Sequence, residues 1–408
     1  MTSRPPKILF IIGAVKPLNS TNANLMLKII QHLSQKCEIH ILSVGAYDNS
    51  TCTIDAYPEL NVALMKYSTT LHICYPSVFY TPSSVSKRIV YRAISRIIDH
   101  GGYEDAYDGF ILRDIICSLD AKHHFQAIFS CMEPYKAAYA LSLIKTNAKK
   151  ILYIIDPPAE VVPGLETACT PFRKSTSKFI IKQSDAIITT SRILRALQIC
   201  AFDLSSKNIL AEEFPLFAPL TYHPNIPSIS FDKTKINLLY CGWLRNEDFL
   251  LQLVQHMDNR FSLTFVGNDN GRVKNLHTDV SIVTHTSVEH NIAVNAILDA
   301  DILVCIGNTY PVHIPSKIFE YIASGKPIIN LYHFPECPTL EHTKRYPLAL
   351  NISTSMSVEE AAAQVMAFCL KNGGKRVPDS TLAEIYQSIA SESIIENICT
   401  KIIDEVST

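Results

Sequence analysis

Short runs of β-branched and other apolar residues recur through the chain, and a longer stretch with helical periodicity separates each run from the next. In the first half these runs are Lys7–Ile12, Glu38–Val44, Ala127–Ser130, Lys150–Ile155 and Asp185–Thr189. They are nearly continuous in apolar character, which is typical of strands that are buried on both faces. The pattern predicts a parallel sheet covered by helices.

The same alternation repeats in the second half, with runs at Ile236–Cys241, Ser262–Val266, Ser281–Val283, Asp301–Ile306 and Pro327–Leu331, and a last strand near Leu348–Ile352. A length of 408 residues also favours two domains, because a single hydrophobic core stops growing at roughly 250–300 residues. The sequence therefore predicts two Rossmann-like, doubly wound α/β domains in series. We expect a ligand cleft at the carboxyl ends of their strands, where open α/β sheets bind ligands.

The proline-rich stretch that includes Pro215, Pro219, Pro224 and Pro227 cannot be a helix interior or a central strand. We expect the interdomain linker there. The predicted organisation is an N-terminal domain at 1–214, a linker at 215–234, a C-terminal domain at 235–385 and a final helix at 386–408. The N-terminal domain is the expected packing partner of that helix.

Composition excludes several classes of function. The chain has 37 Lys and Arg residues against 38 Asp and Glu residues, so no basic excess is present to neutralise a nucleic-acid backbone, and nucleic acid is not an expected partner. No run approaches the 18–20 apolar residues of a membrane span. The polar start lacks the features of a signal peptide, and the 12 cysteines include no C-x2-C pair. We expect buried thiols and a cytoplasmic location.

The most informative segment is 299–331, DADILVCIGNTYPVHIPSKIFEYIASGKPIINL. It predicts a buried strand, a loop at Gly307–Ile314, and a helix of about ten residues with Pro315 in its first turn and Gly325 just past its end. The free backbone N–H groups at such a helix start are suited to binding an anion.

Ser316 and Lys317 occupy the first turn of this predicted helix, and Glu320 follows one turn later. A hydroxyl, backbone amides and an ammonium group could converge on a diphosphate, each charge-assisted bond contributing about 1.5–3 kcal/mol. The Glu320 carboxylate could accept hydrogen bonds from both hydroxyls of a ribose. The alternative is structural: Ser316 caps the helix, and Lys317 and Glu320 form a solvated i, i+3 pair.

These residues also support a resemblance to a known family. Pro315–Tyr321 (PSKIFEY) and Gly325–Ile328 (GKPI) resemble the donor-binding motif of GT-B glycosyltransferases in the large retaining family 4, especially those that build bacterial surface polysaccharides. Tyr240–Arg245 (YCGWLR) resembles the strand and loop that open the family's C-terminal domain, and Phe265–Gly267 resembles its next strand end. Asp185–Ser191 (DAIITTS) resembles a late strand of its N-terminal domain.

The resemblance implies a GT-B fold, a nucleoside-diphosphate sugar as donor, and a glycan or lipid-linked saccharide as acceptor. It implies that Glu320 binds the donor ribose and that Ser316 and Lys317 bind the diphosphate. Arg245 is implied as a further phosphate ligand, which would stabilise the leaving group together with Lys317. We also assign a set of strand-end residues to the donor site: Gly242, Gly267 and Thr284.

Two positions depart from the family's pattern. Val312 stands where the family often has a first glutamate, eight residues before Glu320. Leu250 stands where a lysine usually follows Arg245 by five residues. Both departures concern the sugar-binding part of the site and leave the nucleotide-binding part intact.

The N-terminal half offers weaker candidates. The loop that contains Gly13 and Asn19 follows the first predicted strand, where it would approach a sugar or an acceptor, or only cap the next helix. Glu133 and Asp156 follow two further predicted strands. As candidate catalytic residues they would orient the acceptor hydroxyl or assist its deprotonation, whereas the structural alternative for each is a turn-capping acid.

Residues 85–100 have the pattern of a basic amphipathic helix. One face gathers apolar residues such as Ile89 and Ile94, while Lys87, Arg88 and Arg92 lie elsewhere. Such a helix could rest on anionic lipid at the inner face of a membrane. The alternative is a surface helix packed on the core of its domain.

The resulting hypothesis is a glycosyltransferase that moves a hexose from a nucleotide sugar with retention of configuration. No metal or other cofactor is expected, because Arg245, Lys317 and the helix N-terminus can stabilise the leaving phosphate. One alternative is a nucleotide-sugar epimerase of the same fold. Another is a catalytically silent nucleotide-binding subunit that supports a partner transferase.

Overall fold

The computed structural model describes residues 5–12, 21–44, 70–74, 86, 89–91, 93–94, 105–133, 135–158, 161–162, 171–215, 217–244, 248–273, 276–286 and 288–407. The chain divides into two compact units. One consists of Met1–Phe214 together with Glu392–Thr408, and the other is Pro215–Ser391. Of the sequence-predicted residues, Arg245, Gly13 and Asn19 lie outside the described ranges, as does most of 85–100.

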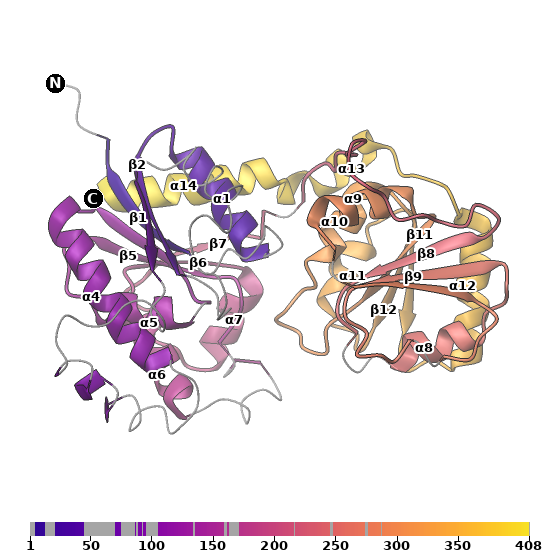
Figure 1. The fold of residues 1–408 in the computed structure, drawn as a ribbon, viewed down its shortest axis with the longest axis horizontal. Coiled ribbons are helices and arrows are strands. Elements are labelled where there is room, and N and C mark those ends of the chain that lie inside the picture. Colours follow the sequence, from indigo (N-terminus) through magenta and orange to yellow (C-terminus); the bar gives the residue numbers. More distant parts are fainter. Residues whose placement is uncertain are drawn as a thin grey trace. The chain divides into compact units, whose positions relative to one another are not determined.

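The first unit contains a seven-stranded parallel sheet in the order β3-β2-β1-β4-β5-β6-β7. Its strands are β1 (Lys7–Ile12), β2 (Glu38–Val44), β3 (Thr70–Cys74), β4 (Ala127–Cys131), β5 (Lys149–Ile154), β6 (Ala186–Thr189) and β7 (Asn208–Ala211). Its helices are α1 (Thr21–Leu33), α4 (Asp105–His123), α5 (Tyr135–Leu143), α6 (Pro171–Gln183), α7 (Ser191–Ile199) and α14 (Ser391–Ser407). Helices lie on both faces of the sheet (Figure 1).

The second unit contains a six-stranded parallel sheet in the order β10-β9-β8-β11-β12-β13. Its strands are β8 (Ile236–Cys241), β9 (Phe261–Val266), β10 (Ser281–His285), β11 (Ile302–Ile306), β12 (Ile328–Tyr332) and β13 (Ala349–Ser353). Its helices are α8 (Asp248–Gln255), α9 (His290–Asp299), α10 (Lys317–Ser324), α11 (Pro338–Thr343), α12 (Val358–Asn372), α13 (Asp379–Tyr386) and the 3-10 helix η3 (Gln387–Ile389).

The predicted apolar runs coincide with the central strands because these strands are buried on both faces. Every residue of β4, β9 and β11 is buried, for example. β3 and β7 are missing from the predicted set. β7 is short, and its residues are exposed or half-buried, so it lacks the continuous apolar character that identifies the others. The described cysteines are free thiols, and most of them are buried.

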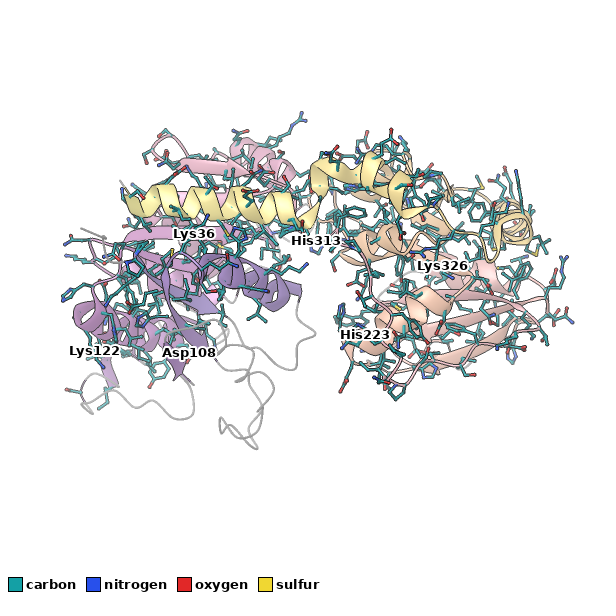
Figure 2. The ribbon with its side chains drawn as sticks, turned by 90° about the horizontal axis from the view of Figure 1, so that it is seen from above. Lys36, Asp108, Lys122, His223, His313 and Lys326 are labelled. Carbon is teal, nitrogen blue, oxygen red and sulfur yellow. The ribbon has the colours of Figure 1, made fainter. Side chains whose placement is uncertain are left out.

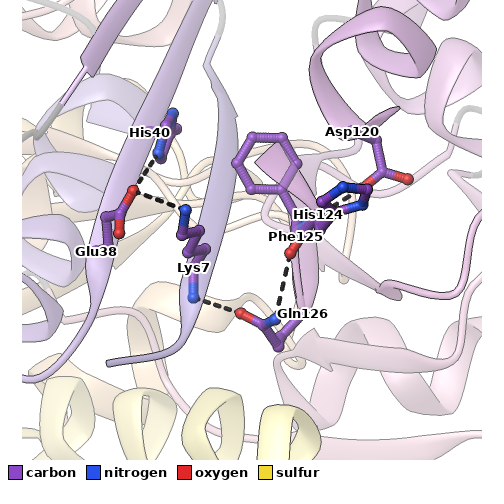
Figure 3. Close-up of polar contacts among 7 residues, drawn as sticks. All are labelled: Lys7, Glu38, His40, Asp120, His124, Phe125 and Gln126. Carbon is purple, nitrogen blue, oxygen red and sulfur yellow. Dashed lines mark hydrogen bonds and ion pairs between the residues drawn. The ribbon is translucent and has the colours of Figure 1, made fainter. Parts of the chain in front are cut away.

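Polar contacts join the amino ends of the first unit's central strands (Figure 3). The Lys7 backbone N–H donates to Oε1 of Gln126 at 2.6 Å. Glu38 Oε1 lies 3.0 Å from Nε2 of His40 and 3.5 Å from Nζ of Lys7. The hydrogen bond from His40 is the main reason that the pKa of Glu38 is lowered. These contacts satisfy polar groups at the amino edge of the first sheet, opposite the carboxyl ends of its strands.

Candidate functional site

The order of the second sheet reverses between β8 and β11, which lie side by side although they are not consecutive in sequence. The chain leaves β8 toward β9 on one side and leaves β11 toward β12 on the other. Open α/β sheets bind ligands outside the carboxyl ends of their strands at such a switch point. The donor candidates Gly242 and Lys317 belong to the segments that follow these two strands.

A glycine directly follows three strands of this sheet. The N–H groups of Gly242, Gly267 and Gly307 extend the ladder by donating to Val266 O, His285 O and Leu331 O at 2.8–3.0 Å. Gly267 has φ of +139°, and a Cβ there would overlap the carbonyl oxygen of Gly242. The loops after β8 and β9 thus pack backbone against backbone, which only glycine permits at this position.

Helix α10 is fixed against the end of β8. The backbone N–H of Cys241 donates to the hydroxyl of Tyr321 at 2.9 Å, and Tyr321 is buried. Ile318, Phe319 and Ile322 on the same helix are fully buried. Because these residues occupy the inner face of α10, Lys317 and Glu320 are left at its half-buried face.

The N-terminus of α10 differs in detail from the prediction. The helix begins at Lys317 and has eight residues, so Pro315 precedes its first turn. Ser316 makes no side-chain capping bond, and within the described part of the chain its hydroxyl has no hydrogen-bond partner. Gly325 ends the helix at φ of 74°, as predicted.

Lys317 and Glu320 form an ion pair in which Nζ donates to Oε2 at 2.9 Å. Their side chains are 34% and 21% exposed, so solvent or a ligand can reach both groups. Burial by itself would lower the pKa of Lys317, but the adjacent Glu320 carboxylate outweighs it and the pKa is raised. The ammonium group is therefore charged at neutral pH.

Both charges act on Cys241 at the end of β8. Burial raises the pKa of this thiol to about 12, while Lys317 lowers the pKa and Glu320 raises it. The thiol is neutral at ordinary pH. These electrostatic contacts place the ion pair beside the strand end from which the Gly242 loop departs.

The loop between β11 and α10 is closed by Asn308 and His313 (Figure 2 labels His313). The amide nitrogen of Asn308 lies 2.8 Å from Nδ1 of His313 and donates to His313 O at 2.9 Å. Val312, which stands in place of a family glutamate, belongs to this loop. Thr284 is exposed near the end of β10, opposite Phe265 of β9.

The two acidic candidates of the N-terminal half follow neighbouring strands of the first sheet. Glu133 accepts a hydrogen bond from the N–H of Tyr135 at 3.0 Å and so caps α5, as its structural alternative proposed. Asp156 is half-buried two residues after β5, and its charge helps to raise the pKa of Cys131. Neither residue belongs to the unit that contains Lys317 and Glu320.

The first unit contains a further carboxyl group near a strand end that the sequence did not predict as a candidate. Glu213 lies two residues after β7, and burial raises its pKa, although Arg192 opposes this and Glu212 adds to it. Burial raises the pKa of Tyr153, and Cys131 and Glu213 add to that shift. The Tyr153 hydroxyl has no hydrogen-bond partner among the described residues. No sequence signal identified Glu213 because β7 was not predicted.

Within the part of the chain that the structure describes, no cluster of three or more His, Cys, Asp or Glu residues is arranged to hold a metal ion. No helix in these described ranges is both long enough and apolar enough to cross a bilayer.

Solved structures provide the comparison for the whole fold. Sucrose-phosphate synthase from Thermosynechococcus elongatus superposes with a TM-score of 0.62 and 13% identity, over 98% of each chain. A glycosyltransferase from Rickettsia africae gives 0.61 and 14% over 99% of each chain. Anabaena HepE in complex with UDP-glucose gives 0.60 and 10%, over 98% of this chain and 99% of that one.

At such low identity these similarities establish the fold. No protein-family model and no curated protein matches the sequence. The chain has the GT-B fold of two Rossmann-like domains, which confirms the predicted fold class.

Proposed function

We propose that this protein is a glycosyltransferase whose nucleoside-diphosphate sugar donor binds at the carboxyl ends of β8 and β11. The observation that supports this most directly is the placement of Lys317 and Glu320. Both lie in the first turn of α10, which the bond between Tyr321 and Cys241 holds at the switch point of the second sheet. The family resemblance of the same segment supports the proposal independently.

In the proposed complex the diphosphate takes the place of Glu320 as a partner of Lys317. The ammonium group, the hydroxyl of Ser316 and the free N–H groups of the helix start then converge on its oxygens. Glu320 is released to accept hydrogen bonds from the two ribose hydroxyls. The ion pair holds both side chains in place before the donor arrives. Little further side-chain entropy is therefore lost when the donor binds.

The chemistry that we propose is departure of the nucleoside diphosphate with its charge stabilised by Lys317, Arg245 and the helix N-terminus. No metal is needed, because these cationic groups can perform that task. A hexose is transferred with retention to a glycan or lipid-linked saccharide. Asp156 and Glu133, with the loop around Gly13 and Asn19, are the proposed acceptor side.

UDP is the first diphosphate to test, because Anabaena HepE was solved with UDP-glucose, with UDP, and with UDP and glucose. Thermal stability should be measured with UDP, ADP, GDP, CDP and dTDP. A ligand at a hundred times its Kd stabilises the fold by about 2.7 kcal/mol. We expect one diphosphate to raise the Tm of the wild type and to have no effect on Glu320→Ala.

Asp379→Ala is the matched control, since Arg376 and Asp379 form another i, i+3 ion pair of 2.9 Å in the same unit, with Asp379 largely exposed. This variant should keep the full Tm shift. If no diphosphate stabilises the wild type, the donor proposal fails. Conversion of the donor without any acceptor would instead indicate the epimerase activity, and donor binding without turnover that a partner protein restores would indicate a supporting subunit.

We also infer that the protein contacts an anionic membrane through residues 85–100. The described helical residues of this stretch contact their domain through Tyr91, whose hydroxyl donates to Asp114 at 2.7 Å and whose ring packs on Phe110. Ile89 is 62% exposed, and Ile94 and Val90 are also exposed. Ile89 and Ile94, the large apolar residues of the predicted face that the structure describes, are thus accessible to lipid, and the sequence of the same stretch includes basic residues.

Cosedimentation with vesicles tests this inference. The wild type should bind vesicles of phosphatidylglycerol and phosphatidylcholine but not pure phosphatidylcholine, and Ile89→Asp with Ile94→Asp should abolish binding. Ile199→Asp is the control, because Ile199 is an exposed apolar residue outside this stretch, at the end of α7. Equal binding by both variants would contradict the inference.

A further inference from the structure

A pocket of about 760 Å³ lies at the amino edge of the second sheet, away from the strand ends that form the proposed donor site. Its volume falls within the range of roughly 300–1,000 Å³ that small-molecule sites occupy. Three segments surround it: residues 228–237 before and at the start of β8, Asp299 and Asp301 before β11, and the end of α12 from Cys369 to Gly373. All of them belong to the second unit.

Two carboxylates line this amino-edge pocket, and each uses one oxygen for a structural bond. Oδ2 of Asp301 accepts from the backbone N–H and the side-chain Nδ2 of Asn237 at 2.9 and 3.0 Å. Oδ2 of Asp299 accepts from the hydroxyl of Ser228 at 2.6 Å. In the described part of the chain, the second oxygen of each carboxylate makes no hydrogen bond. The two groups are therefore held in place while each keeps an acceptor for a ligand.

Two ammonium groups, those of Lys233 and Lys235, line the same pocket. Neither forms an ion pair with Asp299 or Asp301 among the contacts of the described residues. Lys326 (Figure 2) lies close enough for both carboxylates to affect its pKa. Burial lowers the pKa of Lys326, and the charges of Asp301 and Asp299 oppose that shift. Lys326 lies outside the lining, and the four charged side chains that do line the pocket balance, which favours a neutral ligand over an ion.

The rest of the lining is partly apolar. Phe231 is half-buried, and Leu370 is exposed at the pocket. A ligand that fits must therefore donate hydrogen bonds to carboxylates, accept them from ammonium groups, and cover an aromatic ring with an apolar surface. The hydroxyls of a sugar both donate and accept, and the C–H face of a pyranose ring covers an aromatic side chain.

We propose that the amino-edge pocket binds a neutral saccharide through Asp299, Asp301, Lys233 and Lys235, with Phe231 against one face of the sugar ring. The site is separate from the donor site, because it lies at the opposite ends of the same strands. It does not depend on glycosyl transfer, so its test is independent of the proposed function.

The experiment is saturation-transfer difference NMR on the full chain with glucose, galactose, mannose, N-acetylglucosamine and maltose. We expect a saturable signal from at least one sugar in the wild type. Asp299→Asn keeps an acceptor for Ser228 but removes the charge, and Phe231→Ala removes the ring. Each should raise the Kd at least about tenfold, because Asp299→Asn removes a charge-assisted hydrogen bond to the sugar and Phe231→Ala removes the apolar surface that the sugar ring covers.

Glu359→Gln is the matched control, since Glu359 is an exposed acid in the first turn of α12, at the other end of the helix whose last turn lines the pocket. It should leave the Kd unchanged, and saturating UDP should not displace the sugar. The proposal is overturned if none of the five sugars gives a saturable signal. It is equally overturned if both variants bind as the wild type does, or if UDP competes, which would place the sugar at the donor site.

Discussion

The carboxyl edges of the two sheets differ in the residues that follow their strands. In the second sheet a glycine directly follows β8, β9 and β11. In the first sheet Glu133 and Asp156 each follow a strand by two residues, β4 and β5 respectively. These glycines permit close packing within the unit: a Cβ at Gly267 would overlap Gly242 O, and a Cβ at Gly307 would overlap Sγ of Cys337. The first edge is occupied by side chains that serve the fold, since Glu133 caps α5 and Thr190 caps α7. Packing shapes both edges, and what distinguishes the second edge is the partly exposed ion pair of Lys317 and Glu320 beside it.

The two units also differ in how accessible their ion pairs are. Lys136 and Asp108 lie 2.9 Å apart between α5 and α4, and both side chains are buried (Figure 2 labels Asp108). Lys317 and Glu320 lie at the same 2.9 Å, but both are partly exposed. A buried pair cannot exchange partners without leaving a charge unsatisfied. Of these two pairs only the partly exposed one can open for a ligand. Accessibility alone does not identify a binding pair, because the Arg376–Asp379 pair has the same distance and is more exposed.

The sharpest test of the glycine edge is Gly267→Ala. The new methyl group would overlap Gly242 O, and alanine is strained at φ of +139°, so we expect a loss of about 3 kcal/mol or more in the free energy of unfolding. Gly271→Ala is the control, because Gly271 also has positive φ (+72°) but has open space around it. Urea denaturation should show a loss of only about 1 kcal/mol there. Equal losses would mean that strain alone, without close packing of the two loops, explains the glycine.

Tyr321→Phe tests whether the anchor of α10 matters for binding as well as for stability. The N–H of Cys241 would lose its partner, at a cost of about 1–3 kcal/mol. Tyr386→Phe removes a comparable buried bond, from the Tyr386 hydroxyl to His342 O at 2.7 Å. Calorimetry with UDP should show weaker binding for Tyr321→Phe alone. Unchanged affinity in that variant would mean that the anchor only stabilises the fold.

The second edge could be predicted from sequence because its groups are close along the chain. Lys317 and Glu320 are one turn apart on α10, and the positive φ of Gly325 marks the end of that helix. The bond from Cys241 to Tyr321 could not be predicted, since it joins residues 80 positions apart through the order of the strands. In the same way the burial of Glu213 depends on β7, whose exposed and half-buried residues give no continuous apolar run.

Glu213→Gln tests the first edge and should have the smallest effect. Burial raises the pKa of Glu213, so the folded protein retains this proton at a pH where the unfolded chain, with the ordinary pKa of 4.5, has released it. Stability contributed by the protonated group is therefore lost as pH rises from about 4.5 through the raised value. Glutamine does not ionise, so Glu213→Gln does not lose stability in this way as pH rises. We expect the substitution to stabilise the protein at pH 7 by roughly 0.5–1 kcal/mol. The gain should vanish near pH 4, where Glu213 is protonated in both states.

Urea midpoints between pH 4 and pH 8 measure this difference, and Glu396→Gln, which removes an exposed carboxyl on α14, is the control for the change of charge. A stability gain in Glu213→Gln that grows with pH would mean that the carboxyl of Glu213 destabilises the folded protein at neutral pH. Groups that transfer protons often have such perturbed pKa values. It would then join Asp156 and Glu133 as a candidate to assist the acceptor hydroxyl. A loss of stability at pH 7 would show instead that the carboxylate is held ionised by Arg192, and the first edge would remain structural at this position.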